Sequence, residues 1–401
     1  MAGNPPALHT MRLGFLDNLR ILASVLVVIH HAARAYARWG PWPIKQPDSL
    51  TWFDGFFAVN YAFLMSLFFF IAAYFMESAY DRKDRKAVDR QRFFRMVIPM
   101  LFFVLIIIPF EQYAFYTYFR PHAPLPFGKY YFAVYLGFED QPSGWAGPSW
   151  PDIQLAHLWF IEHLVFYGLF YSYYRLFLQK KKGVIRTKLS KTDQKPFPRS
   201  STIILSMVIL IGILFTVRIY SPMNYWTAIL HFFQVEFAHW PQYLLFFMLG
   251  IRSYRHDWIE NLPRSQGKMW LILGLLGVGI IYGLNPLLGG LDNPILLGGL
   301  RWEALAYSAL ETIVCFGLII GLVWLFRDHG TFQTKFMRFL SQSSYLVYLI
   351  HQPIVVLLQY LLFPLAWHPF VKFMFVAITG LGLSFGLSGL IRNTKYGAKY
   401  L

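Results

Sequence analysis

Cysteine and charged side chains are scarce in this chain of 401 residues. Its single cysteine, Cys315, lies in an apolar stretch, so the chain can form no intramolecular disulfide and no cysteine metal site. Only 14% of the residues are charged, whereas 56% are hydrophobic and 19% are aromatic. This balance excludes an ordinary soluble globule and indicates a polytopic membrane protein.

Several common functional motifs are also missing. No glycine-rich phosphate loop precedes a helical pattern, and no serine-centred nucleophile elbow is present. Residues 1–13 are polar and the first apolar segment is too long and irregular for a signal-peptide core, so we expect no cleavable signal peptide. The net charge is +16, but the basic residues cluster between apolar segments instead of forming a domain. We therefore expect no nucleic-acid partner.

Apolar runs of the length that crosses a bilayer recur along the chain. They predict an all-α fold with about ten transmembrane helices in one domain over residues 1–401. The expected spans are 14–35, 56–78, 96–117, 155–177, 201–220, 232–251, 269–287, 303–326, 343–364 and 370–391.

Basic residues are concentrated in every second connection. Seven Lys and Arg residues lie between Arg82 and Arg95 and eight lie between Lys180 and Arg199, whereas residues 118–154 hold only Arg120 and Lys129. Because cytoplasmic loops carry the excess of Lys and Arg, both termini are predicted to be cytoplasmic. We expect a multi-pass protein of the bacterial cytoplasmic (plasma) membrane.

The two longest connections differ in composition. The outer loop, about 118–154, is rich in Pro, Gly, Trp and Tyr, and either covers an external site or forms an interfacial aromatic belt. The basic cytoplasmic loop, about 179–200, is predicted to be a mobile linker that lies against anionic lipid headgroups. Membrane lipids are therefore expected partners.

The first apolar segment carries ionisable residues at both ends. The apolar run between Arg20 and His31 is shorter than the ~20 residues that a spanning helix needs, so ionisable groups must enter the membrane. Eleven helical steps make three turns plus about 20°, so Arg20 and His31 share one face roughly 16 Å apart. This places a cation near the cytoplasmic surface and a possible base at depth, which suits a long donor with a phosphate head.

The segment Arg12 to Tyr36, RLGFLDNLRILASVLVVIHHAARAY, resembles the first helix of the membrane acyltransferase-3 family. The family pattern is an arginine, ten residues and a histidine, here Arg20 and His31. The family includes O-acetylases and glucan succinyltransferases and is typically built on a ten-helix membrane core. The resemblance implies transfer of an acyl group from cytoplasmic acyl-CoA to a hydroxyl acceptor, often outside.

Three further segments resemble the same family. Arg92 and Arg95, followed by Pro99, resemble its arginine pair at the start of the third span. Residues 158–167, LWFIEHLVFY, resemble its tryptophan–glutamate–aromatic motif and place the acid at Glu162, although the usual serine-rich run is missing. Residues 344–353, SYLVYLIHQP, resemble its late histidine–proline motif, with His351.

The basic candidates each have two interpretations. His31 is predicted to act as a general base or as the acyl carrier, against a buried histidine that is only hydrogen-bonded. Arg20 is predicted to hold a CoA phosphate, against a pair with Asp17 on the same face. Arg92 and Arg95 form either a phosphate clamp or ordinary positive-inside anchoring.

Glu162 and His351 are predicted to serve the acceptor. Glu162 either orients His31, binds acceptor hydroxyls or pairs with another helix. His351 is predicted to line the acceptor path, against a structural hydrogen bond, and Pro353 is expected to leave backbone groups free near it. The spacing of these residues and of His157 and His163 matches no ligand motif, so we expect no metal.

Together these residues predict an integral membrane O-acyltransferase with acyl-CoA as donor substrate. An acetyl or another short acyl group would pass to a hydroxyl of a glycan or lipid-linked sugar. The alternative is a proton-coupled secondary transporter that uses His31, Glu162 and His351 as a relay, and a third interpretation is a lipid-binding scaffold. The Arg–ten–His spacing and the arginine pair favour the acyltransferase, because a transporter has no reason to carry them.

Overall fold

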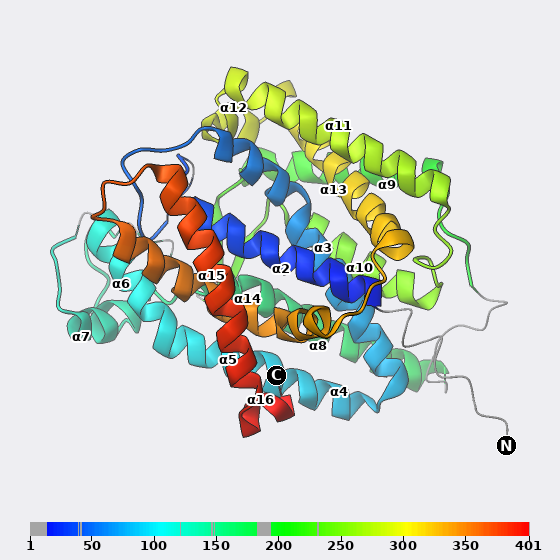
Figure 1. Cartoon of the computed structure of the whole chain (residues 1–401), viewed down its shortest axis with the longest axis horizontal. Helices are drawn as coiled ribbons and strands as arrows, with labels where there is room; N and C mark the ends of the chain where they lie inside the picture. The colour runs from blue at the N-terminus through cyan, green and yellow to red at the C-terminus, as the bar shows by residue number, and fades with distance from the viewer. Residues whose placement is uncertain are drawn as a thin grey trace.

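The computed structural model describes residues 14–38, 40, 42–120, 122–145, 147, 149–182, 194–230 and 232–400. Long helices run side by side, and α2 (Gly14–Arg34) lies among them near the centre of the view in Figure 1. It contacts α3, α13, α14 and α15, so the segment that carries Arg20 and His31 is surrounded by other helices.

The helices after α2 follow the order of the predicted spans. They are α3 (Trp52–Arg82), α4 (Arg85–Arg92), α5 (Ile98–Phe102), α6 (Ile108–Phe119), α7 (Phe127–Lys129), α8 (Trp159–Lys182), α9 (Ser200–Tyr220), α10 (Trp240–Arg255), α11 (Arg264–Leu288), α12 (Pro294–Leu297), α13 (Trp302–His329), α14 (Lys335–Leu362), α15 (Pro369–Arg392) and α16 (Lys395–Tyr400). Short π-helical or 3-10 segments are η1 (Phe93–Val97), η2 (Phe103–Ile107), η3 (Tyr130–Tyr135), η4 (Ala156–Leu158) and η6 (Gly290–Asp292).

The all-α class is confirmed. In the described part of the chain, eight helical segments are long and apolar enough to cross a membrane. They correspond to eight of the predicted spans, and α8 and α10 occupy the positions of the fourth and sixth. The predicted number of about ten spans and the cytoplasmic placement of the termini stay predictions.

The sixth predicted span, 232–251, is wrong in its first part. Strands β1 (Trp226–Ile229) and β2 (Phe233–Glu236) form an antiparallel hairpin in which Trp226 pairs with Glu236, and α10 begins only at Trp240. The hairpin is rich in aromatic and β-branched residues, which are common in strands. The same residues are apolar, so a hydropathy pattern also assigns them to a membrane span. Hydropathy alone cannot separate the two cases.

The third span is one continuous helical segment, Arg85–Thr117, interrupted by the π-helical turns η1 and η2. Pro99 and Pro109 follow these turns, at the starts of α5 and α6. A proline has no N–H to donate to the carbonyl four residues earlier, so the carbonyls of Arg95 and Leu105 lack their usual α-helical donor. Side chains from other segments take them: Tyr345 donates to Arg95 and Tyr131 to Leu105, the latter over 3.0 Å.

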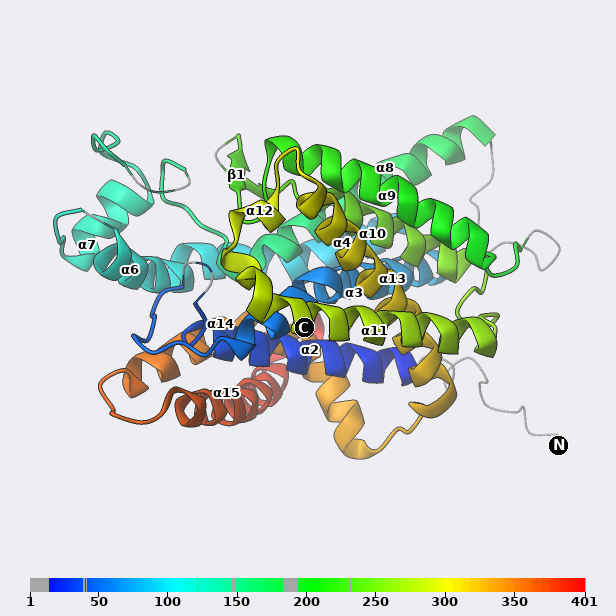
Figure 2. The same cartoon turned by 90° about the horizontal axis from the view of Figure 1, so that it is seen from above.

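The predicted outer loop is folded. Figure 2 shows α6, α7 and the residues that follow them projecting at one end of the molecule. Inside this region the buried side chains of Arg120 and Asp152 form two hydrogen bonds of 2.8 and 2.9 Å, and Tyr130 donates to Asp152 over 3.0 Å. The buried ion pair of Arg120 and Asp152 is stable only if the loop surrounds it and supplies its hydrogen bonds, so it fixes the conformation of the loop. Of the predicted basic loop, residues 183–193 lie outside the described residues.

Candidate active site

His31 on α2 and His351 on α14 face each other across the helix interface. His31 Nδ1 lies 2.7 Å from His351 Nε2, and His351 is fully buried while His31 is partly exposed. Trp42 stacks on the imidazole ring of His31, with ring centroids 5.4 Å apart. His30 points elsewhere, packing edge-on against Phe57 at 4.7 Å, as expected from its 100° displacement around the helix.

The hydrogen bonds fix which nitrogen of each ring carries a proton. His351 Nδ1 lies 2.8 Å from the carbonyl of Tyr348 and 3.1 Å from that of Val347, and a carbonyl can only accept. In the neutral ring Nδ1 is therefore protonated and Nε2 accepts from His31 Nδ1. His31 Nε2 then carries a lone pair, and none of the described residues donates a hydrogen bond to it.

His157, just before α8, completes a histidine cluster, the name used below for His31, His157 and His351. Its ring lies 5.1 Å from that of His351, and its Nε2 donates to the carbonyl of Leu349 over 2.9 Å. Leu349 precedes Pro353 by four residues, so its carbonyl has no helical donor. The backbone group that Pro353 was expected to free is thus the one that holds His157.

The end of α2 is fixed to α14 by Gln359. The last carbonyls of a helix lack helical donors, and the Gln359 amide donates to those of His31 and Ala32 over 3.1 and 3.0 Å. The same amide accepts from Trp42 Nε1 at 2.7 Å. Gln359 therefore positions both the backbone of His31 and the ring stacked on its imidazole.

The three predicted phosphate-binding arginines line one cavity of about 230 Å³. Arg20 enters it from α2, Arg92 from α4 and Arg95 from η1, so residues far apart in the sequence converge at the end of the molecule predicted to be cytoplasmic. The other residues that line the cavity are mostly apolar. Ser24 and Tyr348 also line the cavity, and the Tyr348 ring lies 5.9 Å from that of His351.

Arg20 and Arg92 are each held in place by hydrogen bonds to neighbouring helices. Arg20 pairs with Asp17 at 2.9 Å and donates to Ser341 Oγ at 2.8 Å, so both interpretations of this residue are compatible with its geometry. Its Nε is buried without a partner in the described structure. Arg92 donates to the carbonyl of Leu164 over 2.7 Å. Gly168 permits this approach, because a Cβ there would lie 2.3 Å from the guanidinium.

Glu162 does not contact the histidine cluster. Its Oε2 accepts the backbone N–H of Gln234 over 3.0 Å, and it is 3% exposed. The Gln234 side chain in turn donates to the carbonyl of Ile153 and to Gln154. Of the three interpretations of Glu162, this contact corresponds to pairing with another element, the hairpin. Within the described ranges no group of three or more His, Cys, Asp or Glu residues is arranged to hold a metal ion.

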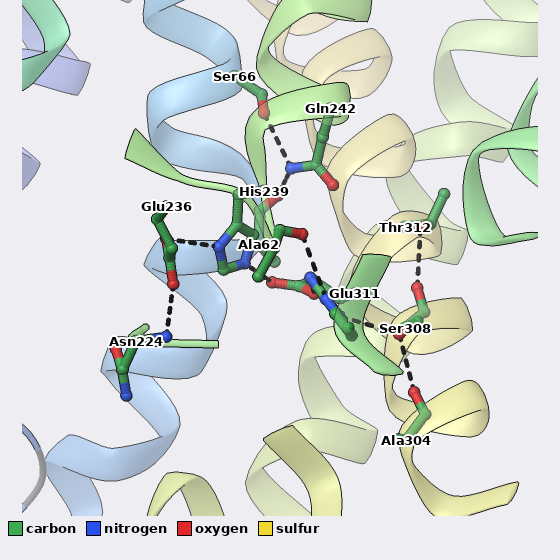
Figure 3. Close-up of polar contacts among 12 residues, drawn as sticks. Ala62, Ser66, Asn224, Glu236, His239, Gln242, Ala304, Ser308, Glu311 and Thr312 are labelled. Carbon is green, nitrogen blue, oxygen red and sulfur yellow. Dashed lines mark hydrogen bonds and ion pairs between the residues drawn. The ribbon is translucent and has the colours of Figure 1, made fainter. Parts of the chain in front are cut away.

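A second polar cluster was not predicted from the sequence. We call it the ion network: Arg218, Glu236, His239 and Glu311. Figure 3 labels Glu236, His239 and Glu311. Arg218 bonds one Glu311 oxygen at 2.6 Å, and His239 Nε2 lies 2.7 Å from the other. His239 Nδ1 lies 2.8 Å from Glu236, whose second oxygen accepts from the backbone of Asn224 at 2.7 Å. The network joins α9, β2, the start of α10 and α13.

The ion network is electrically balanced. All four side chains are 3% exposed or less. Both nitrogens of His239 face carboxylate oxygens, which requires both to donate and makes the ring a cation. Two cations then oppose two anions, as burial demands. No sequence spacing connects Glu311 with Arg218 or His239.

Residues 13–389 match the acyltransferase-3 family, described as an acyltransferase domain, and the chain belongs to this family. No curated protein and no solved structure shows significant similarity to the chain. Membership makes the protein an acyltransferase, and the eight membrane-length helices make it a multi-pass membrane protein. The transporter alternative is not favoured.

Proposed function

We propose that this protein is an O-acyltransferase of the bacterial cytoplasmic membrane. It takes an acetyl or another short acyl group from acyl-CoA and transfers it to a hydroxyl of a glycan or lipid-linked sugar. One observation carries the proposal: the cavity lined by Arg20, Arg92 and Arg95 extends to Tyr348, which lies beside His351 and thus next to His31. An acyl-CoA donor requires groups that bind its phosphates and a base near its thioester. The arginines can serve the first need, and His31, whose partner His351 lies beside Tyr348, can serve the second.

The arginines suit the CoA head in charge and in geometry. Guanidinium groups bind phosphate oxygens through paired, charge-assisted hydrogen bonds, and three of them converge here. The apolar lining beyond them suits the pantetheine arm. Ser24, one turn after Arg20 on α2, contributes a buried hydroxyl that has no partner among the described residues and can bond an amide of that arm.

The tautomer of His31 fits the chemical step. In the base route, Nε2 removes the proton of the acceptor hydroxyl, whose oxygen forms a bond to the thioester carbon. The carbon–sulfur bond then breaks, and the thiolate takes the proton from His31 to give CoA thiol. Nδ1 keeps its hydrogen bond to His351 throughout, which holds the imidazole ring of His31 in one orientation.

The same lone pair also serves a covalent route. Nε2 attacks the thioester carbon, the carbon–sulfur bond breaks, and CoA leaves as the thiolate. The acyl-imidazolium then passes its acyl group to the hydroxyl oxygen, and the hydroxyl proton goes to the thiolate to give CoA thiol. An acyl adduct on a His31 peptide, trapped by rapid quenching and found by mass spectrometry, would establish this second route.

The first test measures CoA binding and thiol release by the purified protein in nanodiscs over a panel of acyl-CoAs. Arg95→Gln should raise the dissociation constant of acyl-CoA about 10- to 100-fold, since it removes charged hydrogen bonds worth ~1.5–3 kcal/mol. Arg90→Gln is the matched control, because Arg90 is exposed on the same helical segment outside the cavity. Equal effects of the two substitutions would favour general positive-inside anchoring, and a folded protein with neither CoA binding nor turnover would overturn the proposal.

A further inference from the structure

A second cavity, of about 410 Å³, lies between α6 and α14. Pro353, directly following Gln352, is part of its wall, and Ile44 from the connection after α2 closes another side. The same connection carries Trp42, which stacks on His31. The three histidines do not line this cavity, but α14 and the connection that carries Trp42 contribute both to its wall and to the contacts of the histidine cluster. The cavity is distinct from the cavity of the arginines.

A buried carboxyl group with one unused oxygen lies at the wall of this cavity. Glu111 lines the cavity and is 5% exposed. Its Oε2 accepts from Gln352 Nε2 over 2.7 Å, while its Oε1 has no hydrogen-bond partner among the described residues. An unsatisfied buried acceptor costs about 1–3 kcal/mol, so a donor in the cavity would be bound with the corresponding gain.

The outer rim of the cavity is apolar and exposed. Phe110 and Leu357 are each 58% exposed and Tyr360 is 51% exposed, although all three lie on helices long and apolar enough to span the membrane. Such residues face the bilayer. The cavity therefore opens sideways toward lipid, from where a soluble molecule does not arrive.

We propose that this cavity is the acceptor subsite and takes a membrane-embedded amphiphile with a hydroxylated head group. The apolar chain lies along Phe110 and Leu357, and a head-group hydroxyl donates to Oε1 of Glu111. The proposal rests on the acyltransferase function proposed above and narrows its acceptor to a lipid-linked sugar. Gln352 connects the two sites, because it bonds Glu111 and directly follows His351 in the chain.

The test uses an alkyl β-glucoside with a photoreactive diazirine in its alkyl chain and the full-length protein in nanodiscs. Mass spectrometry should place the cross-links on α6 and α14, around Phe110 and Leu357. Excess unmodified alkyl glucoside should compete at least 10-fold better than free glucose or the same chain with a methylated head group. Labelling on other helices, or equal competition by free glucose, would overturn the proposal.

Two variants make the test specific. Glu111→Leu should lower labelling about 10-fold, whereas Glu139→Leu, which replaces a glutamate exposed in the outer loop, should leave it unchanged. Leu357→Trp should block the cavity from its rim without touching the carboxyl group. Acyl-CoA binding, which needs none of these three residues, should be unchanged in all three variants and reports on folding. Unaltered labelling in Glu111→Leu contradicts the subsite, while lost CoA binding in the wild-type protein contradicts only the proposed function.

Discussion

The histidine cluster and the ion network are both buried between helices, but they use their hydrogen-bonding groups differently. In the ion network both ring nitrogens of His239 and both oxygens of Glu311 are occupied. In the histidine cluster, Nε2 of His31 receives no hydrogen bond from the described residues, and His157 Nδ1 is buried without a partner there.

We expect this difference to separate a structural role of the ion network from a chemical role of the histidine cluster. A network in which every charge is matched gains nothing from a ligand and loses several kcal/mol when one member is removed. A histidine whose ring is held at one nitrogen and open at the other is oriented for proton transfer. Depth in the membrane alone does not distinguish the two, because both clusters contain ionisable groups in apolar surroundings.

Replacing the open histidine should have the largest effect. His31→Ala is expected to lower acyl transfer about 10²- to 10⁴-fold, the usual contribution of a general base, without lowering the unfolding temperature. Thiol release and thermal unfolding in nanodiscs measure the two quantities. Retention of more than a tenth of the activity would remove His31 from the chemical step.

Breaking the ion network should act on stability instead. Arg218→Met leaves an unmatched buried carboxylate and is expected to lower the free energy of unfolding by about 3–5 kcal/mol. The double variant Arg218→Met/Glu311→Leu restores charge balance between His239 and Glu236, and should recover at least half of that loss. A double variant no more stable than the single one would contradict the charge-balance argument.

His351 tests the connection within the histidine cluster. His351→Leu removes the acceptor for His31 Nδ1 and should lower kcat about 10- to 100-fold with an unchanged KM for acyl-CoA. His351→Gln supplies an amide oxygen in that place and should recover part of kcat. The kcat and KM of the two variants test whether His351 positions His31. A general loss of packing would instead lower kcat equally in His351→Leu and His351→Gln.

The smallest effect is expected at His30. Its ring packs against Phe57, and its Nδ1 is buried without a partner in the described structure. His30→Phe removes this unsatisfied atom while keeping an aromatic ring, so stability should rise by about 1 kcal/mol with little change in activity. Thermal unfolding and thiol release beside His31→Ala show whether adjacent histidines on one helix have opposite roles.

Local spacing predicted part of the candidate site. Arg20 and His31 lie on one α-helix, so their relative placement follows from helical geometry, and the arginine pair could be placed at a span end in the same way. The family resemblance added His351, whose contact with His31 spans 320 positions and has no local signal. The role of each residue in catalysis stays a prediction.

Two features could not be predicted, for different physical reasons. The second strand of the hairpin before α10 contains aromatic and β-branched residues that are also apolar, so the hydropathy pattern included it in a span and hid the contact between Glu162 and Gln234. The ion network joins Arg218 to Glu311, 93 positions apart on separate helices. Pairs of this kind are decided by tertiary packing, which a single sequence does not show.

The carbonyls freed by proline have a consequence for biogenesis. An isolated helix in lipid cannot leave a carbonyl without a donor except at a cost of several kcal/mol. The carbonyl of Arg95 receives its donor from Tyr345, 250 positions later, and that of Leu349 receives its donor from His157. The third predicted span therefore reaches its final stability only after late synthesis brings α14, the ninth predicted span, beside it. A nascent chain truncated before α14 should be a substrate for membrane quality-control proteases.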